Sequence, residues 1–129
     1  MIRIRASVIA LALVLPAAAP AATDPMVVFV CEHGAAKSVI ASAYFNKIAA
    51  EKGLRARAVY RGVNPEAALS VSALKGLRDD GLTAPTQNPS AITPQDVETA
   101  AVIFAIGCAL PKHAVDSGKT DTWMDVPGD

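Results

Sequence analysis

The chain is poor in the residues that build metal centres and disulfide frameworks. Its 129 residues include two cysteines, Cys31 and Cys108, and two histidines, His33 and His113. These four residues show no close metal-ligand spacing, which argues against a metal site. The sequence implies neither a catalytic metal nor an organic cofactor.

The chain also lacks an excess of one charge and a long apolar run, and it has few aromatic residues. The 12 Lys and Arg residues balance the 12 Asp and Glu residues, and aromatic residues make up 5% of the chain. The aromatic residues are scattered, and no basic stripe accompanies them, so nucleic-acid binding is poorly supported. The apolar run over residues 6–15 is too short to cross a bilayer.

The first 21 residues are typical of a secretory signal peptide. Arg3 and Arg5 form a short basic region, and the apolar run is followed by small residues. The tripeptide at 19–21 fits the small-x-small rule, so we expect cleavage just after Ala21. We therefore expect export to the periplasm without stable membrane association, and an uncleaved membrane anchor is the less favoured alternative.

Residues 22–129 have the pattern of one domain in which strands alternate with helices. Strands are predicted over residues 26–30, 56–60 and 101–106, with helices that begin near Ser38, near Ser70 or Ser72, and at Thr93. This alternation predicts an α/β fold whose parallel sheet is covered on both faces. The sheet has four strands if the polar tail supplies the last one.

The segment 31–38, Cys-Glu-His-Gly-Ala-Ala-Lys-Ser, joins an apolar strand to an amphipathic helix. Such a loop gathers free backbone N–H groups and the positive end of the helix dipole around one point. That point suits an oxyanion, and a helix N-terminus favours the thiolate form of a nearby cysteine. The residues expected to hold the anion are Glu32, His33, Gly34, Ala35, Ala36, Lys37 and Ser38.

Individual side chains of this segment have further predicted roles. The small residues 34–36 keep the loop narrow, Lys37 places a positive charge over the anion, and Ser38 hydrogen-bonds the Cys31 sulfur. His33 either contacts the substrate and favours the thiolate or is solvated, and Glu32 is expected to point outward. The alternative for the whole segment is a buried strand-end cysteine followed by a helix cap.

The strand–loop–helix pattern resembles the low-molecular-weight protein tyrosine phosphatase family, whose superfamily includes the thioredoxin-coupled arsenate reductases. The resemblance rests on Val28-Phe29-Val30-Cys31, five further residues up to Lys37, and then Ser38. Residues 61–65, 71–82 and 123–127 are similar to weaker family motifs. The resemblance covers nearly all of residues 22–129 and implies a three-layer sandwich around a four-stranded parallel sheet.

The resemblance also implies a mechanism for phosphomonoester hydrolysis, with protein phosphotyrosine as one candidate substrate. Cys31 would attack phosphorus to form a phosphocysteine, while Asp125 protonates the leaving oxygen and later activates water. Asp129 is a second candidate for this acid, because Val126 separates Asp125 from the proline that usually follows it. Loop amides and Lys37 would stabilise the transferred group.

The chain departs from the family pattern in two ways. The family has arginine at the position of Lys37, and a lysine cannot grip two oxygens in a planar fork, so we expect weaker transition-state stabilisation. The family also continues into a last helix, so we expect a chain shortened at its C-terminus.

Two alternatives stay open. Cys108 ends the third predicted strand as Cys31 ends the first, so their sulfurs are expected at one crevice. The resemblance then implies an arsenate reductase, with Cys31 as nucleophile and Cys108 as resolving thiol, unless Cys108 is only a small buried residue. The other alternative is a non-catalytic periplasmic module that binds an oxyanion. The expected partner is a phosphate- or arsenate-bearing substrate, and the sequence does not determine the oligomeric state.

Overall fold

The computed structural model describes residues 13–17 and 23–127. The signal-peptide predictions on Arg3, Arg5 and Ala21, and the second acid candidate Asp129, lie outside the described residues. Within the described part of the chain, no helix is both long and apolar enough to cross a membrane.

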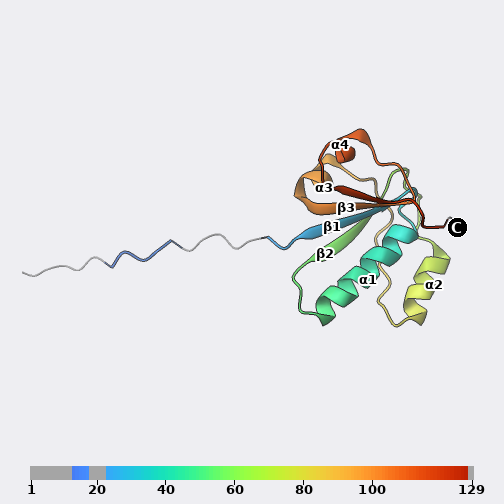
Figure 1. Ribbon diagram of the computed structural model, residues 1–129. Coiled ribbons are helices and arrows are strands. Elements are labelled where there is room, and N and C mark those ends of the chain that lie inside the picture. Colours follow the sequence, from blue (N-terminus) through green and yellow to red (C-terminus); the bar gives the residue numbers. More distant parts are fainter. Residues whose placement is uncertain (1–12, 18–22, 128–129) are drawn as a thin grey trace, which may run out of the picture.

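Four parallel strands form one sheet of order β2-β1-β3-β4 (Figure 1). They are β1 (Met26–Cys31), β2 (Arg57–Gly62), β3 (Ala100–Ile106) and β4 (Thr120–Trp123). Every residue of β1 is buried, as expected for an apolar strand between two neighbours and under two layers of helices. The predicted α/β fold is confirmed, and the polar tail does supply the fourth strand.

Helices cover both faces of the sheet (Figure 1). They are α1 (Lys37–Glu51), α2 (Val71–Asp79), α3 (Pro94–Thr99) and α4 (Lys112–Val115). α1 and α2 lie on one face, and α3 and α4 lie on the other, which gives the expected three layers. In the described residues no helix follows β4.

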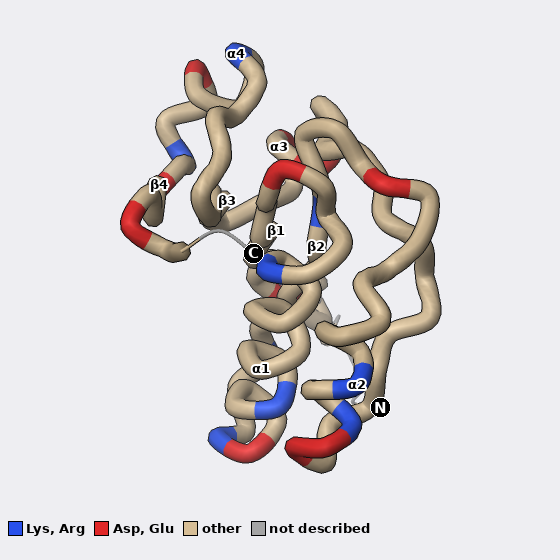
Figure 2. The backbone as a smooth tube through the Cα atoms, turned by 90° about the vertical axis from the view of Figure 1, so that its right-hand side faces the viewer, with Lys and Arg blue, Asp and Glu red and all other residues tan. Residues whose placement is uncertain are grey.

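Polar side chains define where the helices begin. Ser70 is the N-cap of α2, since its hydroxyl accepts from the Ala73 N–H at 3.3 Å. Thr93 and Asp96 form a reciprocal capping box at the start of α3, with Pro94 at the first helical position. In the described part of the chain, Lys and Arg positions alternate with Asp and Glu positions, as the blue and red segments of Figure 2 show.

The alternation of side chains along β1 separates two apolar clusters. Val28 and Val30 pack with residues of β3, α3 and α4. Phe29 and Cys31 point to the opposite face and pack with residues of α1 and β3. The last residue of β1 therefore presents its thiol on the side of α1.

Candidate active site

The loop of residues 32–36 packs closely against the end of β2. Gly34 has a φ of +62°, and a Cβ placed on it would lie 2.7 Å from the backbone nitrogen of Gly62. A Cβ on Gly62 would in turn lie 2.8 Å from the Gly34 nitrogen. Only glycine at both positions permits this approach, so these two residues set the shape of the loop.

Backbone hydrogen bonds tie the loop to the segment that follows β2. The N–H groups of Val63, Asn64, Glu66 and Ser70 donate to the carbonyl groups of Cys31, Glu32, His33 and Ala35, at 3.1, 2.8, 3.1 and 2.9 Å. These carbonyl groups are therefore bonded to the segment that follows β2. The N–H groups of residues 32–36 donate to no acceptor within the described part of the chain. Such a set of free donors at a helix start is a site for an anion.

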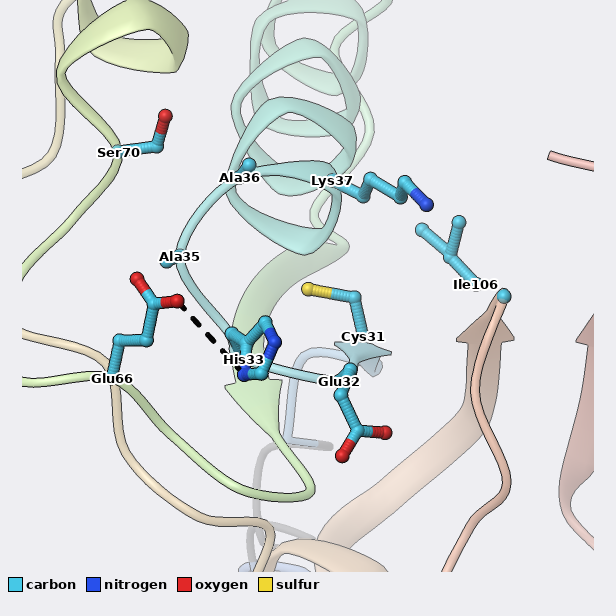
Figure 3. Close-up of a pocket in the computed structure, with 10 residues that line it drawn as sticks. Cys31, Glu32, His33, Ala35, Ala36, Lys37, Glu66, Ser70 and Ile106 are labelled. Atoms are coloured by element: carbon cyan, nitrogen blue, oxygen red, sulfur yellow. Dashed lines mark ion pairs between the residues drawn. The ribbon is translucent and has the colours of Figure 1, made fainter. Parts of the chain in front are cut away.

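A cavity of about 370 Å³ opens where β1 ends and the loop of residues 32–36 begins (Figure 3). It is lined by Cys31, Glu32, His33, Ala35, Ala36, Lys37, Glu66, Ser70, Ile106 and Gly107. The structure thus brings most of the predicted site residues together around one space. Gly34 and Ser38 lie outside the lining and act on it through the loop backbone and through Cys31.

The Cys31 thiol lies at the base of the loop, and its side chain is buried. Its Sγ lies 3.2 Å from the Oγ of Ser38, which is fully buried at the start of α1. This is the contact that the sequence predicted between the two residues. A hydroxyl at this distance can donate to a thiolate and stabilise its charge.

The charged side chains beside the thiol point in different directions. Lys37 extends toward Ile106 (Figure 3), with its Nζ 3.5 Å from the position of a Cβ on Gly107. Glu32 points away from the Cys31 sulfur, as expected, and its carboxylate accepts from the Asn64 amide at 2.6 Å. The positive charge therefore lies along the β3 side of the cavity, and the Glu32 charge is directed away from the thiol.

His33 lies at the mouth of the cavity and is exposed. Its Nδ1 donates to the Asn64 carbonyl at 3.3 Å and lies 4.0 Å from the Glu66 carboxylate. Glu66 and Ser70 also line the cavity, and neither is among the site residues that the sequence predicts. Both follow β2, and the rule that sites form at the carboxyl ends of parallel strands could have pointed to that segment.

Cys108 is separated from Cys31 by the backbone of β1. Its Sγ lies 3.6 Å from the Val30 carbonyl, in the cluster on the α3 and α4 side, and both thiols are free. Burial raises the pKa of the Cys108 thiol, and the nearby Cys31 and Glu32 raise it further. The two sulfurs therefore lie on opposite faces of β1 and do not line one crevice as expected. The raised pKa favours the protonated form of the Cys108 thiol.

Asp125 is exposed in the segment after β4 and does not line the cavity. That segment does return to the edge of the site. The Gly107 N–H donates to the Trp123 carbonyl at 2.8 Å, and the Val126 carbonyl lies 3.7 Å from the position of a Cβ on Gly107. The segment that contains Asp125 therefore passes beside Gly107, which lines the cavity, but Asp125 itself does not line the cavity.

The residues that the structure describes hold no group of three or more His, Cys, Asp or Glu side chains arranged to bind a metal ion. The cavity itself presents the Cys31 thiol, the Ser70 hydroxyl, backbone amides of the loop and the titratable side chains of its rim.

Comparison with known proteins agrees with the geometry. The profile of the low molecular weight phosphotyrosine protein phosphatase family matches residues 26–119. No curated protein sequence matches the chain at a significant level.

Several solved structures share the fold. YfkJ from Bacillus subtilis aligns with a TM-score of 0.65 at 20% identity, over 78% of this chain and 70% of its own. A low molecular weight protein tyrosine phosphatase from T. tengcongensis gives 0.65 at 21%, over 77% and 73%. A thioredoxin-dependent arsenate reductase from Corynebacterium glutamicum gives 0.66 at 21%, over 85% of this chain and 54% of its own.

Proposed function

Since the chain belongs to the low molecular weight phosphotyrosine protein phosphatase family, we propose that it hydrolyses phosphomonoesters through Cys31. The observation that carries the proposal is the loop of residues 32–36. Its N–H groups are free of partners in the described chain, and they surround a thiol at the base of a cavity. Free amide donors around a nucleophile are what a transferred phosphoryl group requires.

The first step is attack of the Cys31 thiolate on phosphorus. The Sγ–P bond forms, the bond from phosphorus to the leaving oxygen breaks, and that oxygen takes a proton. The loop amides hold the equatorial oxygens, and Lys37 adds a positive charge from the β3 side. In the second step water attacks phosphorus, the Sγ–P bond breaks, and Ser38 stabilises the departing thiolate through the 3.2 Å contact.

The resemblance assigns the proton-transfer role to Asp125. For this role residues 124–127 would have to move the carboxylate over the mouth, because the side chain is exposed and outside the lining. The role is testable with Asp125→Asn, which is expected to slow hydrolysis most for substrates with poor leaving groups.

The test of the function is hydrolysis of para-nitrophenyl phosphate with reductant present. We expect activity that Cys31→Ser abolishes and that Cys108→Ser, the matched thiol variant, retains. Acid quench during turnover should trap phosphate on the unmodified protein and on Cys108→Ser. A folded protein that binds phosphate without turnover would instead be a non-catalytic oxyanion-binding module.

The rival proposal is an arsenate reductase in which Cys31 is the nucleophile and Cys108 the resolving thiol. It is supported by the fold shared with a known arsenate reductase. The placement of Cys108 on the other face of β1 weighs against it. Arsenate-dependent oxidation of both thiols, abolished by Cys108→Ser, would favour this rival.

We also propose that the chain is exported and cleaved after Ala21. The support is the basic, apolar and small-residue order of the first 21 residues. The intact mass of the protein recovered from a periplasmic fraction tests this, and a chain that begins at Ala22 is expected. A full-length mass in the membrane fraction would indicate the uncleaved anchor.

A further inference from the structure

We propose that a groove between α1 and α2 binds the residues that flank the phosphorylated residue of a protein substrate. The inference rests on the proposed hydrolysis by Cys31 and adds the surface that selects the substrate. The groove begins at the active-site cavity and follows the two helices away from it. Its occupant is an extended peptide with apolar side chains.

Two surface hollows continue the cavity and share lining residues with it and with each other. The first has a volume of about 460 Å³ and shares Ala36 and Ser70 with the cavity. The second has a volume of about 280 Å³ and shares Ile40, Ser72 and Ala73 with the first. In Figure 3 Ser70 lies on the side of the cavity where α2 begins. A chain that enters the cavity can therefore continue along the groove.

Two rows of residues at four-residue spacing border the groove. They are Ala36, Ile40 and Tyr44 along α1, and Ser72, Gly76 and Asp80 along α2. Residues four apart lie on one side of a helix, and the two helices lie side by side in Figures 1 and 2. The Tyr44 hydroxyl donates to the Asp80 carboxylate and closes the far end of the groove.

The cavity itself gives a substrate little apolar contact. Its loop amides and thiol serve the phosphoryl group, and Ile106 is the largest apolar side chain among its lining residues. A phosphoryl group is the same in every phosphomonoester, so discrimination between substrates needs contacts beyond the loop. The groove supplies apolar surface beside the cavity, because Ile40 is 38% exposed and lines both hollows.

Gly76 leaves space in the second hollow. It is exposed within α2, its φ is not positive, and a Cβ placed on it would meet no atom within 4 Å. Glycine inside a helix is less favourable than alanine, and no close contact at this position requires it. The packing of the fold does not account for this glycine, whereas a ligand that lies against α2 does.

The walls suit a peptide better than an acyl chain. The Ser70 and Ser72 hydroxyl groups lie 3.0 Å apart beside the apolar surface, and each can bond a backbone group of a peptide. From Ser72 to Asp80 a helix rises about 12 Å. An extended chain covers this length with about four residues, so the groove can contact several side chains of one substrate.

The experiment compares two phosphotyrosine peptides that differ only beside the phosphorylated residue. One carries two leucines on each side, and the other carries two serines on each side. para-Nitrophenyl phosphate is too small to reach the groove and reports the reaction in the cavity alone. We expect kcat/KM to be about 10-fold higher for the leucine peptide than for the serine peptide, as burial of apolar side chains in the groove requires.

Two variants test the groove in different ways. Ile40→Ser removes an apolar wall, and Gly76→Phe fills the open space. Each should lower kcat/KM for the leucine peptide to that of the serine peptide and leave hydrolysis of para-nitrophenyl phosphate unchanged. Ile48→Ser, at a position of α1 that is 45% exposed and outside the groove, is the matched control for the first. Gly76→Ala, which leaves the groove open, is the control for the second.

The other outcomes each overturn the proposal. Equal rates for both peptides, or a preference that survives both variants, would show that the groove binds no substrate. An equal loss with para-nitrophenyl phosphate would show that Ile40 acts only through the shape of the loop. Faster hydrolysis of dodecyl phosphate than of the leucine peptide would place an acyl chain in the groove. A dimer that Gly76→Phe converts to a monomer in sedimentation would place a second copy of this chain there.

The failure of this inference differs from the failure of the function on which it rests. Without Cys31-dependent hydrolysis of para-nitrophenyl phosphate by the unmodified protein, the proposed function falls, and the role of the groove falls with it. If that hydrolysis is present and the leucine peptide has no advantage, only the role of the groove is refuted.

Discussion

At the scale of single residues, the reactivity of Cys31 depends on the buried hydroxyl of Ser38. The Ser38 Oγ lies 3.2 Å from the sulfur. A hydrogen bond to a charged group contributes roughly 1.5–3 kcal/mol. We therefore expect Ser38→Ala to lower kcat for para-nitrophenyl phosphate by roughly 10- to 100-fold.

The matched control for Ser38→Ala is Ser42→Ala. Ser42 is also buried in α1, but its hydroxyl donates to the Val39 carbonyl at 3.0 Å, away from the thiol. Ser42→Ala should lower the free energy of unfolding without a comparable loss of kcat. Equal effects of both variants on kcat would show that Ser38 matters only for packing.

Lys37 is the second residue whose chemistry can be tested alone. Its ammonium is a point charge, whereas a guanidinium can hold two equatorial oxygens in a planar fork. The added bond acts mainly in the transition state, so Lys37→Arg should raise kcat more than it lowers KM. Steady-state kinetics with para-nitrophenyl phosphate measures both constants, with Lys47→Arg as the control on the exposed part of α1. An unchanged kcat would sink this idea.

At the scale of elements, a bidentate ion pair joins β2 to α3. The Arg61 Nε and Nη2 donate to the two carboxylate oxygens of Asp96 at 2.8 and 3.0 Å, and the side chains are 24% and 10% exposed. Burial raises the pKa of Asp96, but hydrogen bonds from Arg61 and Thr93 and the Arg61 charge outweigh it. The pKa is lowered from 3.8 as a result.

We predict that Asp96→Asn destabilises the fold by about 2 kcal/mol, less than the roughly 3–5 kcal/mol for a fully buried pair. Because the folded pKa of Asp96 lies below 3.8, its stabilisation is complete above that pH. It is lost as the pH falls through the folded pKa. Urea unfolding at several pH values should show a constant difference between the two proteins above about pH 5, which shrinks below about pH 4.

Asp79→Asn is the control for this measurement. Asp79 pairs with Lys75 one turn away on α2, and both side chains are more than half exposed. Such a pair contributes less than about 0.5 kcal/mol. A loss for Asp96→Asn no larger than that of the control, or a difference that ignores pH, would contradict the assignment.

The short elements of the tail show the limit of sequence patterns. α4 and β4 have four residues each, which is too short for a helical or alternating period to be visible. Their positions depend on contacts from elsewhere in the chain. The Lys119 ammonium donates to the carbonyl groups of Val97 and Glu98 at the end of α3, at 2.8 and 2.9 Å. A pattern read along the chain contains none of these contacts.

At the scale of the whole molecule, the parts of the site that lie close in the sequence were predictable. β1, the loop and α1 form one continuous run, so their order alone indicated a thiol at an anion site. Glu66 and Ser70 line the cavity, and Asn64 bonds to the loop, only because β2 lies beside β1 in the sheet. Their roles depend on strand order and register, and the sequence does not display either directly.

Gly107 explains why the two thiols are separated. In β3, Ile106 belongs to the cluster of Cys31, so strict alternation would place Cys108 on that same side. Gly107 has a φ of +62°, which ends the strand and turns the chain, and Cys108 enters the cluster of Val30 instead. The left-handed backbone conformation of Gly107 thus changes the face of the sheet on which the Cys108 thiol lies.

This separation predicts unequal reactivity of the two cysteines. Cys31 lines the cavity, whereas Cys108 does not, and burial raises the pKa of the Cys108 thiol. Under native conditions iodoacetamide should therefore label Cys31, and inorganic phosphate should protect it. Cys108 must wait for a local opening, and an opening that costs about 3 kcal/mol slows its labelling by roughly 100-fold.

Peptide mass spectrometry over a time course measures both rates. Cys31→Ser and Cys108→Ser, each with one remaining thiol, show which signal belongs to which cysteine. Low concentrations of urea should speed labelling at Cys108 and leave Cys31 nearly unchanged, because only Cys108 depends on opening. Comparable rates at both cysteines in native buffer would mean that the two thiols share one accessible crevice. The arsenate reductase proposal would then gain the resolving thiol that it needs.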